Sequence, residues 1–129
     1  MITARYHREI PQRYRFEASK CTKCGKVSFP PRLICPKCGC QKFRTINLKD
    51  AGKILTYTVI RVGPDKFSKE TPYAIGIVEV SDGVRLTTQI VDTDVDKLKI
   101  GQKVKLVFRK IQDDGKAGIH MYGYKAVLA

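Results

Sequence analysis

Cys21-Thr22-Lys23-Cys24-Gly25 and Cys35-Pro36-Lys37-Cys38-Gly39 are two copies of one short motif, a Cys-x-x-Cys pair followed by glycine. Each copy can place two thiolates along one edge of a tetrahedral Zn²⁺ site, and the loop from Val27 to Leu33 is long enough to bring the pairs face to face. The glycine supplies a positive φ without steric cost, and the amide N–H groups of such a turn can point at the sulfurs. The sequence therefore predicts a rubredoxin-like zinc ribbon with metal ligands Cys21, Cys24, Cys35 and Cys38.

Disulfides are the main alternative for these cysteines, and reduced core cysteines are a third. Disulfides require an oxidising compartment. The segment from Met1 to Ile10 carries Arg5, Arg8 and Glu9 and has no apolar run resembling a secretory signal. We therefore expect a cytoplasmic protein whose cysteines are reduced and bind a metal.

Cys40 is the fifth cysteine. Its use as a ligand would break the Cys35/Cys38 pair, so we expect a free thiol near the site. Four thiolates close the coordination shell of zinc and leave no position for a catalytic water. The metal is therefore expected to hold structure and to perform no chemistry.

Composition and charge narrow the classes of function. The chain has 129 residues, 43% of them hydrophobic, which suits a soluble domain with a small metal-bound module. No apolar run approaches the length of a membrane helix. The net charge is +13, and residues 1–50 hold 12 basic and 3 acidic side chains. Such a field attracts nucleic acid, acidic protein surfaces or phosphorylated cofactors, although a solvated lysine-rich surface is the simpler explanation for scattered charges.

The chain divides into three predicted parts: a basic N-terminal arm with a short helix (1–19), the zinc ribbon (20–44) and a β-barrel (45–129). Pro11 is positioned to start the helix, which we expect to run to about Ala18. The arm contains four arginines, whose planar side chains favour bound anions and interfaces. It is either a docking segment for a partner or a segment packed on the chain's own barrel. Thr45 to Gly52 is predicted to be a connector.

The third part reads as five strands. They are rich in β-branched residues and separated by glycine, proline and aspartate, and we place them at 53–62, 73–80, 84–91, 103–112 and 119–128. Asp94 is predicted to cap a short helical turn between the third and fourth strands. Gly76 would permit the bend by which a small barrel turns its corner. This order predicts an OB-fold barrel in a mainly β protein, with a plain five-stranded meander as the alternative.

Alternation predicts which residues of these strands face the core. In the third strand Val84, Leu86, Thr88 and Ile90 share one face. In the fourth strand Val104, Leu106 and Phe108 are expected to face inward.

No catalytic arrangement stands out in the sequence. The two histidines, His7 and His120, lie in unrelated segments, and the carboxylates cluster in turns. We therefore predict that the chain is not an enzyme, which leaves two kinds of binding protein. Nucleic-acid binding suits a basic zinc-ribbon and OB-fold chain, but the second and third strands offer only Tyr73 as a stacking aromatic. The other hypothesis is an accessory module for enzymes whose substrates carry anionic groups.

Several motifs together resemble one known family, the zinc-ribbon and OB-fold acyl-CoA-associated proteins. The likeness runs from about Tyr6 to Lys125, and its motifs are the two cysteine knuckles, Phe29-Pro30-Pro31-Arg32, Pro72-Tyr73-Ala74-Ile75-Gly76-Ile77-Val78-Glu79 and Ile100-Gly101-Gln102-Lys103-Val104. The arm, Arg5 to Arg15, is similar to that of the small archaeal subunits that bridge acetoacetyl-CoA thiolase and hydroxymethylglutaryl-CoA (HMG-CoA) synthase.

This resemblance implies a non-catalytic scaffold of the mevalonate route to isoprenoids. It would join the two enzymes in a hetero-oligomeric complex, with a CoA moiety bound near a shared interface. In an OB-fold the loop between the first two strands commonly meets ligands. Here that loop offers Lys66, Phe67 and Lys69 as candidate CoA-binding residues. An ordinary solvated loop is the alternative for these three.

Overall fold

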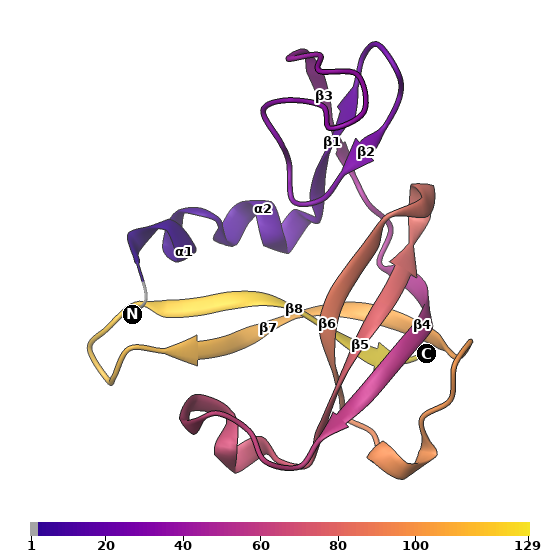
Figure 1. Cartoon of the computed structure of the whole chain (residues 1–129). Helices are drawn as coiled ribbons and strands as arrows, with labels where there is room; N and C mark the ends of the chain where they lie inside the picture. Colours follow the sequence, from indigo (N-terminus) through magenta and orange to yellow (C-terminus); the bar gives the residue numbers. More distant parts are fainter. Residues whose placement is uncertain (1–2) are drawn as a thin grey trace.

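The computed structural model describes residues 3–129, so the first two positions of the predicted arm lie outside it (Figure 1). Its elements are α1 (Ala4–Arg8), α2 (Ile10–Arg15), β1 (Glu17–Cys21), β2 (Val27–Ser28), β3 (Phe43–Asn47), β4 (Ala51–Ile60), η1 (Asp65–Glu70), β5 (Tyr73–Val80), η2 (Ser81–Gly83), β6 (Arg85–Val91), η3 (Val95–Lys97), β7 (Lys103–Asp113) and β8 (His120–Leu128). Here η denotes a short 3-10 helix. Within residues 3–129, no helix combines the length and the apolar character needed to cross a membrane.

The ribbon is built on a three-stranded antiparallel sheet in the order β2-β1-β3. The prediction of a helix through Ala18 is wrong, because α2 ends at Arg15 and β1 begins at Glu17. Phe16, between them, has a left-handed conformation with φ of 50°, which ends the helix. The predicted connector is also partly strand, since β3 extends to Asn47 and pairs with β1. Pairing with a distant segment decides both differences, and local sequence preference does not report it.

The barrel closes in the order β4-β5-β6-β8-β7. Its β6 and β8 strands run parallel, with Ile90 opposite Ala126 and Val91 opposite Val127. A meander of hairpins contains no parallel pair, so the closed order excludes that alternative and confirms the OB-fold. The predicted strands agree with β4 to β8 to within about two residues at most ends. The predicted cap is also present, because the Asp94 carboxylate accepts a hydrogen bond from the N–H of Asp96 at the start of η3.

The barrel core follows the predicted alternation except at one position. In β6 the side chains of Leu86, Thr88 and Ile90 are buried as predicted. In β7 Val104 and Leu106 are buried, but Phe108 is only half-buried and does not join the core. The β7–β8 hairpin continues beyond the barrel wall at this point, so the inward face of the strand no longer faces the core (Figure 1).

The arm packs on this extension of the β7–β8 hairpin, as Figure 1 shows. The Arg13 guanidinium donates a hydrogen bond of 2.9 Å to the carbonyl oxygen of Tyr122. The Phe108 ring stacks on Tyr122 at a centroid distance of 5.3 Å and meets the Tyr14 ring edge-on at the same distance. Of the two roles predicted for the arm, packing on the chain's own barrel is therefore observed.

Ribbon and barrel share one continuous core. Ala18 of β1 and Leu48, which follows β3, belong to the same buried cluster as the barrel residues. The N–H of Leu48 donates to the carbonyl oxygen of Phe16 at 2.9 Å. From the ribbon loop, the Phe29 ring packs on Tyr124 of β8 at a centroid distance of 5.4 Å. These contacts fix the ribbon on the barrel and bring its loop next to β8.

Gly76 lies where two strands and a core side chain approach each other closely. A Cβ atom at this position would lie 2.9 Å from the carbonyl oxygen of Thr56 and 2.9 Å from Cδ1 of Ile90. Backbone atoms on the paired strand cannot give way without breaking the ladder. Glycine is therefore required at position 76, because the structure leaves no room for a Cβ atom.

We expect Gly76→Ala to destabilise the protein by about 1–3 kcal/mol, because the added methyl group overpacks the β4–β5 contact. Gly115→Asn is the matched control, since Gly115 has φ of 78° with open space around it and asparagine tolerates that conformation. Chemical denaturation followed by circular dichroism measures both. An unchanged midpoint for Gly76→Ala would show that the strands can separate at no cost.

Candidate functional site: a four-cysteine metal centre and an adjacent cavity

Two backbone turns of the same form position the four cysteines of the ribbon. In the first, the N–H of Gly25 donates to the carbonyl oxygen of Cys21 at 3.0 Å, and in the second Gly39 donates to Cys35 at 2.9 Å. The glycines have φ of 77° and 75°, as the motif predicted, and open space surrounds the position of a Cβ at both. Here glycine is needed for its conformation, because a Cβ would strain the left-handed backbone.

These turns bring all four predicted ligands together. The sulfurs of Cys21, Cys24, Cys35 and Cys38 lie within 4.8 Å of one another. Across the two turns the Sγ atoms of Cys21 and Cys38 are 3.5 Å apart, as are those of Cys24 and Cys35. A disulfide needs about 2.05 Å, whereas the edge of a tetrahedral zinc–sulfur site is about 3.8 Å for Zn–S bonds of about 2.3 Å. The donor set and its spacing fit a tetrahedral thiophilic metal.

The pKa shifts of Cys21, Cys35 and Cys38 also suit a site built for a cation. The N–H of Cys24 donates to the Cys21 sulfur and, against the effect of burial, lowers the pKa of Cys21 to about 6. The N–H of Cys38 likewise lowers the pKa of Cys35. The N–H of Cys40 favours the Cys38 thiolate, but burial and the three neighbouring sulfurs outweigh it and raise the pKa of Cys38 to about 12. Four thiolates at this spacing repel one another, and a divalent cation removes that cost.

Cys40 stands apart from the cluster, as expected for the fifth cysteine. Its Sγ accepts a hydrogen bond of 3.4 Å from the N–H of Lys42, and its carbonyl oxygen accepts one of 2.9 Å from the N–H of Cys35. Its backbone therefore closes the second turn, while its side chain does not join the group of four sulfurs.

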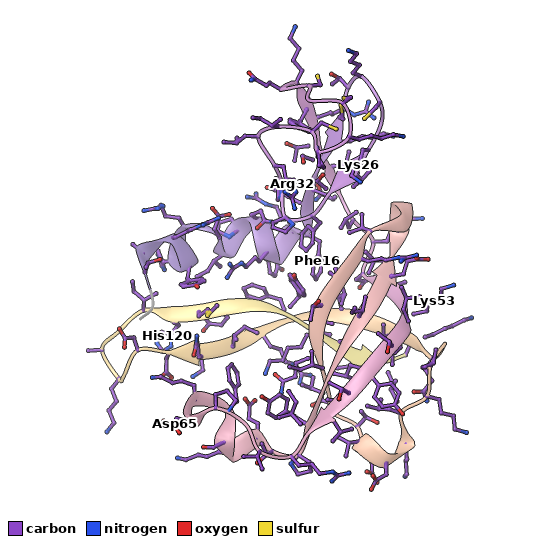
Figure 2. All side chains as sticks on the ribbon, in the orientation of Figure 1. Phe16, Lys26, Arg32, Lys53, Asp65 and His120 are labelled. Atoms are coloured by element: carbon purple, nitrogen blue, oxygen red, sulfur yellow. The ribbon has the colours of Figure 1, made fainter. Side chains whose placement is uncertain are left out.

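A cavity of about 420 Å³ lies where arm, ribbon loop and barrel meet. Arg5 and Arg13 line it from the arm, Phe29 from the ribbon loop, and Ile75 and Met121 from the barrel. Figure 2 shows side chains from these three parts converging below the arm, next to the labelled Phe16. The cavity thus combines charged arm residues, the two arginines and Glu9, with apolar and aromatic walls. The sequence did not reveal it, because its lining comes from segments distant along the chain.

The three residues predicted to bind CoA lie on η1, at the edge of this cavity. Phe67 is half-buried and lines the cavity, and its ring packs on Tyr73 at a centroid distance of 6.2 Å. Lys66 and Lys69 are exposed on the same short helix and are not among the lining residues. The structure thus brings one of the three to the cavity and leaves the two lysines in solvent.

A buried lysine connects η1 to the barrel. Lys125 of β8 is 6% exposed, and its Nζ lies 3.5 Å from Oε1 of Glu70, at the end of η1. Removing one partner of such a pair leaves a charge in a poorly hydrated place, which is costly. The pair therefore ties η1, and with it Phe67, to the strand that lines the cavity.

The two histidines lie in unrelated segments of the sequence, yet both line a second hollow. His7 comes from α1 and His120 from the start of β8, and Ile10 and Tyr122 lie beside them. Figure 2 places the labelled His120 near the end of the hairpin, below the arm. Packing of the arm on β8 brings them together, and local sequence gives no signal of it.

Fold and site together define a protein with a zinc-ribbon cysteine cluster joined to an OB-fold barrel. Two family models match the chain, the rubredoxin-like zinc ribbon domain of ChsH2 at residues 8–44 and its C-terminal OB-fold domain at residues 45–109. The chain therefore belongs to the ChsH2 family of DUF35 proteins.

Three relatives describe the family further. A DUF35 domain-containing scaffold protein of Methanothermobacter thermautotrophicus is 44% identical over 95% of this chain and 93% of its own length. The benzoylsuccinyl-CoA thiolase subunit BbsA of Thauera aromatica is 24% identical over 82% of this chain and 71% of its own. A solved structure described as the Ltp2-ChsH2(DUF35) aldolase superposes with a TM-score of 0.75 and 28% identity, covering 97% of this chain and 92% of that one. These relatives thus include a scaffold protein and a thiolase subunit.

We expect Cys38→Ser to abolish binding of one equivalent of metal and to unfold the ribbon, because three thiolates and a hydroxyl bind zinc far more weakly. Cys40→Ser is the control and should retain the metal. Elemental analysis of both purified variants, with cobalt-substituted protein examined for thiolate-to-metal charge-transfer bands, measures the effect. Loss of metal from Cys40→Ser, or its retention in Cys38→Ser, would reassign the ligands.

Proposed function

We propose that this chain is a non-catalytic scaffold subunit that holds a thiolase-type enzyme and HMG-CoA synthase in one complex of the mevalonate pathway. The observation that carries the proposal is 44% identity to an archaeal scaffold protein over 95% of this chain. The relative named as a thiolase subunit supports an enzyme of thiolase type as one partner. The synthase as second partner rests on the resemblance of the arm, Arg5 to Arg15, to the bridging subunits.

Zinc has a structural part in this proposal. Cys21, Cys24, Cys35 and Cys38 would hold it, and the closed set of four sulfurs leaves no coordination position for substrate. A thiolate site of this kind persists where thiols stay reduced, so we place the complex in the cytoplasm. The metal then fixes the shape of the ribbon that the partners contact.

Holding the two enzymes together has a thermodynamic purpose. Condensation of two acetyl-CoA molecules to acetoacetyl-CoA is unfavourable, whereas its conversion to HMG-CoA is favourable. A scaffold raises the effective concentration of one active site next to the other, to the millimolar range for closely linked sites. Acetoacetyl-CoA is then consumed before the thiolase reaction can reverse.

We further propose that a CoA moiety binds near the cavity, at an interface shared with an enzyme. CoA carries a pyrophosphate and a 3′-phosphate, which lysine and arginine bind through charge-assisted hydrogen bonds. Lys66 and Lys69 are exposed beside the cavity and free to meet such groups, and Phe67 offers an apolar wall within it. Arg5 and Arg13 add positive charge from the arm.

The proposed function predicts which enzymes the chain binds. Tagged protein purified from its native cell should bring down a thiolase-type enzyme together with HMG-CoA synthase, and nuclease treatment should leave both in place. The purified chain alone should show no turnover of acetyl-CoA or acetoacetyl-CoA. Recovery of RNA in place of these enzymes would favour the nucleic-acid alternative, and robust turnover by the pure chain would overturn a non-catalytic role.

The proposed CoA site predicts a role for the two lysines of η1. In the assembled complex, the double variant Lys66→Ala/Lys69→Ala should bind CoA about tenfold more weakly, because two phosphate contacts are lost. Lys97→Ala/Lys99→Ala removes the same charge from the β6–β7 connection, where both lysines are exposed, and should leave the affinity nearly unchanged. Isothermal titration calorimetry measures both. Equal weakening by the two variants would indicate a general attraction by the basic surface and not a site.

A further inference from the structure

The ribbon exposes two large aliphatic side chains next to each other. Leu33 is 88% exposed and Ile34 is 57% exposed, directly before the metal-cluster residue Cys35. We call this pair the ribbon tip. The other large apolar residues exposed within residues 3–129 come singly from separate segments: Tyr14, Val62, Ile77 and Ile100. Single exposed apolar residues are ordinary on protein surfaces, whereas an adjacent pair offers a compact apolar contact.

The loop that carries the ribbon tip is fixed at both ends. On one side the N–H of Arg32 donates to Oγ of Ser19 in β1 at 3.2 Å. On the other side, the N–H of Cys35 donates to the carbonyl oxygen of Cys40, and the sulfur of Cys35 belongs to the four-cysteine cluster. Binding through such a loop costs little ordering entropy, because its backbone is already held. The tip is therefore an apolar contact presented on a rigid support.

All charged side chains in the sequence around the tip are basic. From residue 18 to residue 49 the chain has eight basic side chains and no aspartate or glutamate. Arg32 precedes the tip directly, and Lys37 follows in the second turn, both exposed. Figure 2 shows the labelled Arg32 and Lys26 on the ribbon, where it rises away from the barrel. A partner that meets this surface gains from carboxylates around an apolar centre.

The aliphatic centre distinguishes between two classes of polyanion. Single-stranded nucleic acid is held by stacking on aromatic rings, and the tip has none. Leucine and isoleucine instead fill apolar grooves on proteins, inside a rim of polar and charged contacts. The combination of aliphatic centre and cationic surroundings thus favours an acidic protein surface.

We infer that the ribbon tip inserts into an apolar groove rimmed by carboxylates on the thiolase-type enzyme of the proposed complex. The identity of the enzyme rests on the proposed function; the location and chemistry of the contact rest on Leu33, Ile34 and the basic residues around them. The ribbon is then the part of the scaffold that holds the thiolase-type enzyme, and neither Leu33 nor Ile34 is among the residues that line the cavity.

The double variant Leu33→Ser/Ile34→Ser tests the inference in the full-length, metal-loaded chain. Because both side chains are exposed, the melting temperature and metal content should stay unchanged. The dissociation constant for the purified thiolase-type enzyme should rise at least about 100-fold, since two buried aliphatic contacts are lost. Val62→Ser/Ile100→Ser is the matched control, because it replaces two aliphatic residues outside the ribbon that are at least as exposed, at 94% and 69%. Its dissociation constant should stay within about twofold of the wild type.

Charge reversal adds an independent measurement. Lys23→Glu/Lys37→Glu should slow association and reduce its dependence on salt, whereas the loss of the tip should mainly speed dissociation. If the wild-type chain binds the enzyme and the tip variant binds equally well, the inference is wrong while the proposed function stands. If the wild-type chain does not bind a thiolase-type enzyme, both fail. Loss of synthase binding or RNA binding in the tip variant, with thiolase binding intact, also overturns the inference.

Discussion

The repulsion among four closely placed thiolates is the constraint on which the rest of the structure depends. The ribbon sheet has three short strands, and the buried residues that it contributes to the main core are few. A module of this size cannot be stable through apolar burial alone, and a metal commonly supplies the missing free energy. Backbone N–H groups lower the pKa of Cys21 and Cys35, while the fully ionised cluster needs a cation. The cluster therefore fixes the two cysteine turns of the ribbon relative to each other.

The ribbon is coupled to the barrel through packing and not through a flexible linker. Ala18 and Leu48 lie in the barrel's own core, and Phe29 rests on Tyr124. The arm completes the arrangement, because Arg13 is hydrogen-bonded to β8. A scaffold benefits from this construction, since a rigid body fixes the distance and orientation between two partners, whereas a flexible one only limits their separation.

Local patterns in the sequence predicted the elements that depend on interactions between residues close in the chain. The cysteine turns were found because glycine must follow each pair, and the barrel strands because alternation and turn residues mark them. What failed depended on tertiary contacts. Glu17 and Ala18 became strand because they pair with β3, and Phe108 left the core because the hairpin extends past the barrel wall. The cavity and the shared hollow of His7 and His120 could not be predicted, since each is assembled from segments far apart in sequence.

The Lys125–Glu70 pair anchors the β4–β5 connection to the barrel, although most residues of that connection are exposed. This ammonium group is almost entirely shielded from water, and its carboxylate partner sits on η1. Any displacement of η1 would strand the ammonium in a dry environment, so the connection has one strongly preferred resting position. One β8 side chain thus holds in place the short helix that carries Phe67 at the cavity wall.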